Sequence, residues 1–335
     1  MTRRVNFGLW YDLRNPPRWR VPFERLYQQT LEQIGWAESL GFDSVWLTEH
    51  HFCDDGYTPS PLVVAGAIGA RTRRLRIGTN LLLMPLHDPI RLAEDGATLS
   101  LLTGGRFDLG VGLGYREVEF GAFKRPVRQR TSLLEEGVEI LRRAWRGEPI
   151  AFHGKRFDIG DLRITPVPEH VPKILVGGLA TPAIERAARI GDGFLSTGGI
   201  GCDTFAAVSN NDAAKARGIC VGDWAIVADD PEREAAAVGE HVLYQVNEYI
   251  GWGAFGPPDS VPRFADPAAA LRDGLYELAT PDAAVERLRA LLGRFPQIVD
   301  VHFWARFPGE PVESGARRIE CLATRVLPKL RAALG

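Results

Sequence analysis

Residues 42–52 read FDSVWLTEHHF, and this stretch decides the fold class that we expect for the chain. The apolar run at 42–47 is typical of a buried parallel strand, and Thr48-Glu49-His50-His51-Phe52 follows it directly. Proteins of alternating strands and helices place their chemistry at this carboxyl end of the strands. Histidine suits proton transfer because its unperturbed pKa is about 6.5. The chain has only seven histidines, so two beside a carboxylate indicate a functional site.

Outward from this strand, apolar runs and amphipathic segments alternate along the 335 residues. The pattern predicts eight strand–helix units and therefore an α/β fold, a single (β/α)8 TIM barrel over residues 1–335. Strands are expected at 5–11, 42–47, 75–83, 107–113, 174–176, 193–196, 220–228 and 299–304. Helices are expected at 23–40, 61–73, 89–102, 129–145, 182–190, 231–249, 281–292 and 315–334.

Two stretches interrupt this alternation and are interpreted as insertion loops on the catalytic face. Residues 149–172 are punctuated by Pro and Gly and are expected to form a small hairpin. Residues 251–273 contain GWGAFGPP and show no clear period. Long loops in a compact domain often cover binding sites. We expect substrate specificity to depend on residues 251–273 and on residues 197–214, whose conformations the sequence does not give.

Composition narrows the classes of function. The net charge of −2 gives no general attraction to nucleic acid or to an anionic membrane. The four cysteines are far apart and contain no C-x-x-C pair, which favours free thiols in a reducing compartment. No apolar run is long enough for a signal segment or a membrane span. These features predict a cytoplasmic protein that needs neither nucleic acid nor membrane.

Further polar motifs follow other predicted strands. Asn80 ends the strand in GTNLLLMP (78–85), where its amide contacts a ligand or stabilises its own turn. Gly112 stands among alternating glycines at 110, 112 and 114, which allow a flat ligand to approach the backbone, although no full dinucleotide fingerprint is present. Gly177, Gly178 and Thr181 precede Pro182, which predicts either a phosphate site at a helix N-terminus or an ordinary capped helix.

The histidine pair also has alternative interpretations. Both imidazoles could be satisfied by loop backbone, or they could belong to a metal site. Asp54, Asp55 and His302 are available as further ligands, but their spacing gives no strong support, and we expect no metal.

Taken together, these motifs resemble the bacterial luciferase-like flavin monooxygenase family. The residues that carry the resemblance are Glu-His-His-Phe at 49–52, Gly-Thr at 78–79, Leu-Ala-Glu-Asp at 92–95 and Gly-Arg-Phe at 105–107, followed more loosely by residues 177–193. The resemblance implies a (β/α)8 barrel that binds reduced FMN or the deazaflavin F420 at its catalytic face.

The resemblance also implies roles for individual residues. His50 matches the catalytic histidine, and His51 should matter less, because consecutive residues of a strand point to opposite sides. Asn80-Leu81 matches a non-prolyl cis peptide that packs on the flavin ring. Gly177, Gly178 and Thr181 match the phosphate cradle. Gly112 stands where luciferase has a reactive Cys and Leu113 where it has a phosphate-binding Arg. Light emission is therefore not expected, and Arg116 is the expected phosphate ligand.

We therefore expect a flavin-dependent monooxygenase that uses reduced FMN and dioxygen to oxidise a small organic substrate through a peroxyflavin. A separate flavin reductase would supply reduced FMN, because no NAD(P)H fingerprint is found. Residues expected to shape the substrate pocket are Trp10, Trp252, His302 and Trp304. The alternatives are an F420-dependent oxidoreductase that transfers a hydride without oxygen, and a non-catalytic flavin-binding barrel. A homodimer through the helices at 61–73 and 89–102 is also expected, and the substrate remains unidentified.

Overall fold

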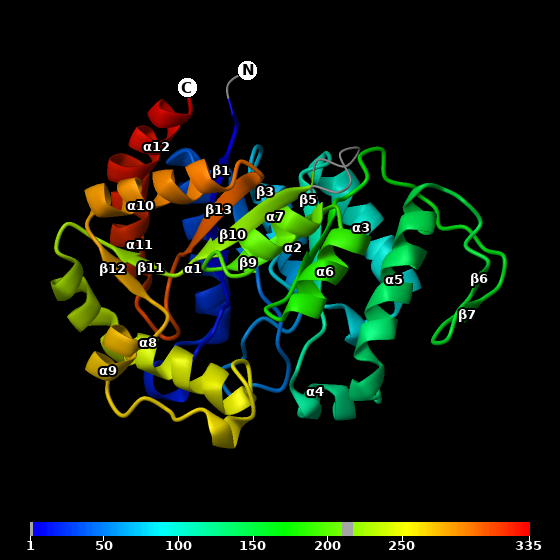
Figure 1. Ribbon diagram of the computed structural model, residues 1–335, viewed down its shortest axis with the longest axis horizontal. Helices are drawn as coiled ribbons and strands as arrows, with labels where there is room; N and C mark the ends of the chain where they lie inside the picture. Colours follow the sequence, from blue (N-terminus) through cyan, green and yellow to red (C-terminus); the bar gives the residue numbers. More distant parts are fainter. Residues whose placement is uncertain (1–2, 210–216) are drawn as a thin grey trace.

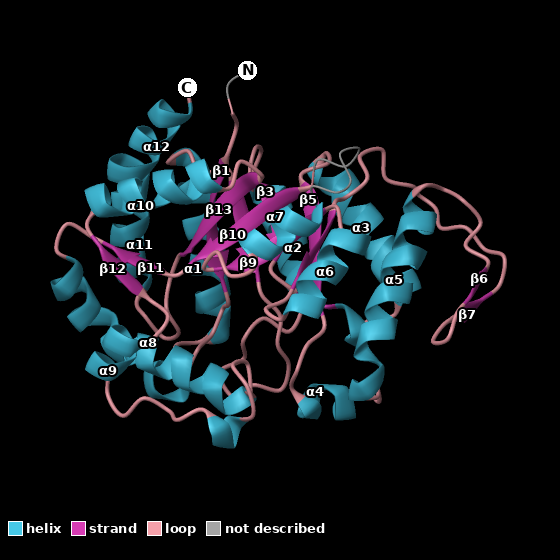
Figure 2. Ribbon diagram, viewed as in Figure 1, coloured by secondary structure: helices cyan, strands magenta, loops and turns pink. Residues whose placement is uncertain are grey.

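Eight parallel strands close into a barrel in the computed structural model, which describes residues 3–209 and 217–335. Each strand pairs with the next, and the last pairs with the first. The ring consists of β1 (Asn6–Tyr11), β2 (Ser44–Leu47), β3 (Arg76–Thr79), β5 (Phe107–Gly112), β8 (Ile174–Gly177), β9 (Gly193–Thr197), β10 (Gly218–Asp223) and β13 (Ile298–Trp304). Figure 2 shows these strands at the centre, with helices around them. The predicted (β/α)8 barrel is confirmed.

Helices lie around this barrel and beyond one of its ends (Figure 1). They are α1 (Phe23–Ser39), α2 (Pro61–Arg71), α3 (Pro89–Thr103), α4 (Glu117–Ala122), α5 (Arg130–Trp145), α6 (Thr181–Ile190), α7 (Cys202–Ser209), α8 (Pro231–Trp252), α9 (Pro267–Asp273), α10 (Pro281–Arg294), α11 (Val312–Cys321) and α12 (Leu327–Leu334). Local chemistry sets their ends, as in α3, where Asp88 accepts hydrogen bonds from the amides of Ile90 and Arg91. Gly104, in the left-handed conformation, ends the same helix.

The alternation of side chains along each strand separates two interiors. In β2, Val45 and Leu47 pack in the layer between barrel and helices. Ser44 and Trp46 point the other way and hydrogen-bond to Asp300 inside the barrel. Room for the indole of Trp46 comes from Gly78, because a Cβ at that position would lie 2.4 Å from the ring. The barrel interior is therefore filled by large aromatic and polar side chains.

Two predicted strands are interrupted, and both interruptions lie at the carboxyl mouth of the barrel. The expected strand 75–83 stops at Thr79, and the chain resumes as β4 (Leu82–Leu83), which pairs with β5. The expected strand 220–228 ends at Asp223. Residues 225–227 then form β11 (Ala225–Val227), which pairs with β12 (Glu277–Ala279) in a separate sheet. Because both stretches are continuously apolar, the sequence did not predict that the chain leaves the barrel after Thr79 and after Asp223.

The predicted insertions and the closing helix differ in part from their expected forms. Residues 149–172 contain the antiparallel pair β6 (Phe152–His153) and β7 (Asp158–Ile159). Residues 251–273 are partly helical, because Asp266 and Pro267 begin α9. Part of the segment 197–214 forms α7, and residues 210–214 lie outside the described residues. A π-helical segment (Leu322–Val326) divides the closing helix. Short 3-10 turns cover Pro17–Trp19, Met84–Leu86, Val127–Gln129 and Pro258–Ser260.

Within residues 3–209 and 217–335, no helix combines the length and the apolar character needed to cross a bilayer.

Candidate active site

A cavity of about 340 Å³ opens where the carboxyl ends of the barrel strands meet. It collects residues that follow different strands: His50 after β2, Leu81 after β3, Tyr115 after β5 and Gly178 after β8. Residues from the end of α8 and beyond it complete the lining on another side. The sequence predicted a functional site at this mouth of the barrel. Six of the predicted site residues line the cavity: Trp10, His50, Asn80, Leu81, Gly177 and Gly178.

His50 lies between two groups that the sequence did not identify. Its Nδ1 is 2.9 Å from Oε1 of Glu119, and its Nε2 is 3.1 Å from the hydroxyl of Tyr115. A carboxylate beside Nδ1 places the proton there and leaves the Nε2 lone pair directed at Tyr115. Burial lowers the pKa of His50, against the opposing effect of the Glu119 carboxylate. His50 is therefore a neutral base whose orientation is fixed.

Glu119 carries several of these contacts at once. Besides His50, its Oε1 accepts hydrogen bonds from the His51 amide at 2.9 Å and from Nη1 of Arg116 at 3.0 Å. Burial raises the pKa of Glu119, but these donors outweigh burial and leave the pKa below its usual value. The carboxylate is therefore ionised near neutral pH.

The other members of the Glu-His-His motif form a separate hydrogen-bonded group, although Glu49 also lines the cavity. Nε2 of His51 lies 3.0 Å from Oε1 of Glu49, and Nε2 of His87 lies 2.8 Å from the same oxygen. Glu49 also accepts a hydrogen bond from the Leu83 amide. Although burial opposes ionisation, these donors lower the pKa of Glu49 to about 2. Glu49 thus joins the His51 segment to the loop after β3, and His51 does not line the cavity.

The Asn80–Leu81 peptide bond is cis, as predicted. The Leu81 side chain lies against Gly112 and Gly177, where a Cβ would be 2.6 and 2.7 Å from its methyl groups. Gly112 therefore makes room for Leu81 and does not itself line the cavity. The carbonyl of Asn80 accepts a hydrogen bond from Nε1 of Trp10 at 3.2 Å.

One end of the cavity is suited to an anion. Gly177, Gly178 and Ala180 lead into the N-terminus of α6, where the positive end of the helix dipole favours a negative group. Pro182 has no N–H and the amide of Ala183 donates to the Ala180 carbonyl, which leaves the Thr181 amide as the early helix amide without a partner in the described chain. Arg130, at the start of α5, lines the same cavity, and in the described part of the chain nothing pairs with its guanidinium. We call Arg130, Gly177, Gly178 and Ala180 the anion subsite.

Two expected phosphate ligands do not line the cavity. Arg116 is engaged by Glu119 and by the carbonyl of His51, its guanidinium stacks 4.5 Å from the ring of Trp252, and it does not line the cavity. The expectation that Thr181 caps α6 is wrong, because Ala180 holds the cap position and no side chain bonds there. Thr181 is an exposed first residue of the helix.

Three of the four residues expected in the substrate pocket lie outside the cavity lining. Trp304 stacks on Trp10 at 4.3 Å. His302 is fully buried in the barrel, where its Nδ1 is 2.9 Å from Asp300 and its Nε2 is 2.8 Å from the Asn80 side chain. Trp252 packs behind His50 at 5.3 Å. A single sequence shows that His302 and Trp304 share a strand but not their depth along it, and Trp252 is the last residue of α8.

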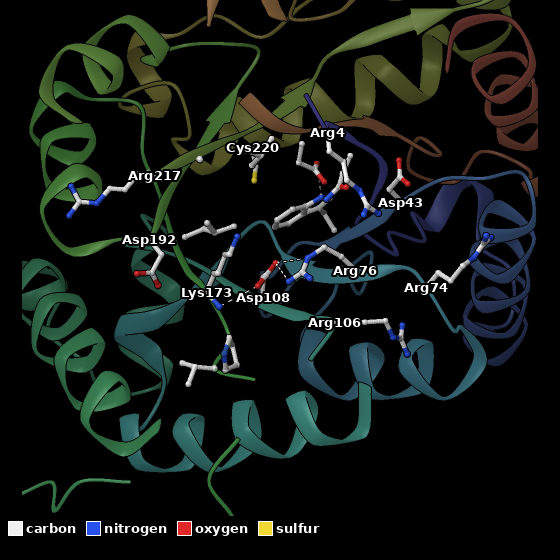
Figure 3. Close-up of a pocket in the computed structure, with 18 of the residues that line it drawn as sticks. Arg4, Asp43, Arg74, Arg76, Arg106, Asp108, Lys173, Asp192, Arg217 and Cys220 are labelled. Carbon is white, nitrogen blue, oxygen red and sulfur yellow. Dashed lines mark hydrogen bonds and ion pairs between the residues drawn. The ribbon is translucent and has the colours of Figure 1, made fainter. Parts of the chain in front are cut away.

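A second cavity, of about 940 Å³, opens at the opposite mouth of the barrel (Figure 3). Its charged side chains are mostly engaged by the protein. Arg76 pairs with Asp108 at 2.6 Å, and Arg106 donates to carbonyls at the ends of α2 and α3. Arg142 pairs with Asp192 and donates to the last carbonyl of α6. Cations at helix C-termini offset the helix dipole, so this mouth serves stability. Across the described ranges, no cluster of three or more His, Cys, Asp or Glu is arranged for a metal.

Comparisons with known proteins agree with this geometry. The chain is 34% identical over 194 residues to the F420-dependent glucose-6-phosphate dehydrogenase of Microbacterium testaceum, which covers 53% of this chain and 58% of that protein. It is 29% identical over 276 residues to the 4-hydroxyprotoasukamycin monooxygenase of Streptomyces nodosus subsp. asukaensis, covering 76% of this chain and 72% of that one. The chain therefore spans little more than half the length of the first of these relatives.

A solved structure covers almost the whole chain. The monooxygenase RslO1 of Streptomyces bottropensis superposes with a TM-score of 0.81 at 25% identity, over 97% of this chain and 99% of that one. Residues 17–291 match the model of the luciferase-like monooxygenase family. Because that match includes most of the barrel and the His50 site, the chain belongs to the luciferase-like monooxygenase family.

Proposed function

We propose that this protein is a flavin-dependent monooxygenase that uses reduced FMN and dioxygen to oxidise a small organic substrate. The observation that carries the proposal is the position of His50, which lies in one cavity with Leu81 and the anion subsite while Glu119 fixes its tautomer. A general base held in this way beside a cofactor site is an arrangement that proton transfer requires.

The described residues fit FMN. Its phosphate would lie at the anion subsite, where Arg130 lacks a partner among the described residues and the N-terminus of α6 offers the unpaired amide of Thr181 and the positive end of its dipole. The flavin ring would pack on Leu81. The absence of side chains at Gly112 and Gly177 leaves the space that the Leu81 side chain occupies. Bound reduced FMN would supply two electrons for the reduction of dioxygen, with one oxygen atom entering the substrate and the other leaving as water.

The side chains of the protein would manage the protons. The neutral Nε2 of His50 can accept a proton, and the Glu119 carboxylate stabilises the imidazolium that results. Burial raises the pKa of Tyr115 well above its usual value, so its phenol stays protonated and can donate a hydrogen bond to His50. His51 supports the site through Glu49 and takes no part in proton transfer.

Arg130 provides the test of this assignment. Arg130→Ala should weaken FMN binding at least about tenfold, the loss expected when a charge-assisted contact is removed. Arg128→Ala is the matched control, because Arg128 is an exposed neighbour outside the cavity lining. Flavin fluorescence and calorimetry would give both dissociation constants. Equal binding by the two variants would show that the phosphate lies elsewhere.

A second candidate is an F420-dependent oxidoreductase that transfers a hydride without oxygen. Similarity to the F420-dependent glucose-6-phosphate dehydrogenase favours it, although that similarity covers 53% of the chain. Against it, the tail of F420 carries glutamate carboxylates in addition to its phosphodiester, whereas Arg130 is the one Arg or Lys among the described residues that line the cavity. Titrating the protein with FMN and with F420 separates the two candidates.

Several associated features complete the proposal. We propose one catalytic domain over residues 1–335, with insertions at about 149–172 and 251–273, in a cytoplasmic protein that obtains reduced FMN from a separate reductase. We also propose a homodimer through α2 and α3. Val63 on α2 and Leu102 on α3 support this pairing, because their side chains are 75% and 67% exposed.

A further inference from the structure

The side of the cavity remote from the anion subsite is built from aromatic rings. From this we infer that the substrate is a neutral, largely apolar ring compound and not a phosphorylated sugar. The inference deepens the proposed function and rests on it for the position of the cofactor. Figure 1 shows the two sides, with α5 and α6 at one and the end of α8 at the other.

Five residues, Trp10, Tyr57, Trp224, Tyr249 and Phe255, form what we call the aromatic wall. The rings brace one another, since Trp224 meets Trp10 edge-on at 6.0 Å and Tyr249 at 6.3 Å. The hydroxyls of Tyr57 and Tyr249 are 2.8 Å apart and satisfy each other. Such a surface offers contact area to a flat or bulky apolar ligand and few free polar groups to a sugar.

The charges that line the cavity indicate the same class of substrate, a neutral ring compound. Glu49 is already bound by His51, His87 and the Leu83 amide, which leaves Arg130 as the one unpaired permanent charge among the described lining residues. A phosphorylated cofactor would occupy Arg130. A second phosphate, on the substrate, would then be buried without a cation, which is strongly unfavourable.

The nearby cations are not available for a substrate phosphate. The guanidinium of Arg14 has no exposed side-chain surface and lies 5.4 Å from the rings of both Tyr57 and Tyr249. Its Nε pairs with Asp55 at 2.6 Å, while its Nη1 and Nη2 are buried without a hydrogen-bond partner in the described chain, and Arg14 does not line the active-site cavity. Arg116 is held by Glu119. Aromatic rings and carboxylates therefore neutralise or cover the positive charge behind the aromatic wall. This arrangement differs from what the name of the glucose-6-phosphate dehydrogenase relative would suggest.

Equilibrium binding tests the inference without requiring turnover. Calorimetry would compare camphor and 2-naphthol with glucose 6-phosphate, using the protein alone and the protein saturated with oxidised FMN. In the protein saturated with FMN, where Arg130 is occupied, we expect the ring compounds to bind at least about tenfold more tightly than the sugar phosphate. Trp224→Leu and the rim variant Phe255→Ala should each weaken ring binding severalfold. Trp19→Leu should not, because Trp19 lies outside the cavity lining, packed on His241.

The outcomes separate this inference from the proposed function. In the FMN-saturated protein, glucose 6-phosphate binding as tightly as the ring compounds would overturn the inference, and so would equal ring binding by wild type and both wall variants. Failure of all three ligands to bind a protein that does bind FMN would also overturn it, while leaving the proposed function intact. If FMN does not bind but the ring compounds bind at the wall, the proposed function fails and the substrate class stands.

Discussion

The carboxylate of Glu119 can be neutralised with little change of shape, which makes Glu119→Gln an informative substitution. Oε1 of Glu119 accepts all three of its hydrogen bonds, from His50, His51 and Arg116, while Oε2 is buried and has no partner within the described chain. A glutamine can keep its oxygen at the Oε1 position and place its amide group at the position of Oε2. The substitution then removes the charge and keeps the hydrogen bonds.

The size of the effect follows from that geometry. A hydrogen bond to a charged group contributes roughly 1.5–3 kcal/mol and a neutral one roughly 0.5–1.5 kcal/mol. The bond between His50 and residue 119 should therefore weaken by about 1 kcal/mol, and turnover should fall about five- to tenfold. The pKa of His50 should fall further below its usual value, because the Glu119 carboxylate is the group that raises it.

Two measurements check this prediction. Proton NMR of the His50 ring across a pH titration reports its pKa, and turnover is measured with enzymatically reduced FMN. Glu117→Gln is the control, because Glu117 is exposed in the same first turn of α4. FMN affinity should be the same in both variants. Wild-type turnover and an unchanged His50 pKa in Glu119→Gln would refute the idea that Glu119 orients and stabilises His50.

Four other outcomes are expected. His50→Ala should lower turnover about 10²–10⁴-fold with flavin binding retained, whereas His51→Ala should cost less, as steady-state kinetics would show. The pKa of Glu49 is lowered to about 2, so its contribution to stability, ~3 kcal/mol, is present above its unfolded pKa and is lost as pH falls toward 2. Urea unfolding of Glu49→Gln should lack that pH dependence. His302→Phe should destabilise the fold by about 1–3 kcal/mol by leaving the Asn80 amide unpaired, measured by thermal unfolding. Sedimentation should give a dimer at micromolar concentration, and a monomer would contradict pairing through α2 and α3.

Sequence periodicity was sufficient for the barrel because each strand is buried and each helix carries one apolar stripe. His50 could be identified because it closely follows a buried strand, at the end of the barrel that opens into the cavity. His51 lies outside the cavity lining and bonds to Glu49, but Glu49 itself lines the cavity, so strict strand alternation does not describe the residues after β2.

Residues that act through tertiary contacts were missed. Glu119 reaches His50 across 69 positions of sequence, and Arg130 meets the α6 N-terminus only when α5 packs beside it. The i,i+3 spacing of Arg116 and Glu119, at the start of α4, was the one local signal for Glu119. His302 was assigned to the substrate pocket because depth along a strand is invisible in a single sequence. The His302 side chain is instead buried inside the barrel, against the side chain of Asn80.

The fate of oxygen tests the central claim most directly. Mass spectrometry would follow a neutral ring substrate that is converted in the presence of ¹⁸O₂ and enzymatically reduced FMN. A flavin-dependent monooxygenase places one ¹⁸O atom in each product molecule and gives no product without oxygen. A product that carries no ¹⁸O and forms anaerobically with F420 would contradict the account and establish hydride transfer in its place.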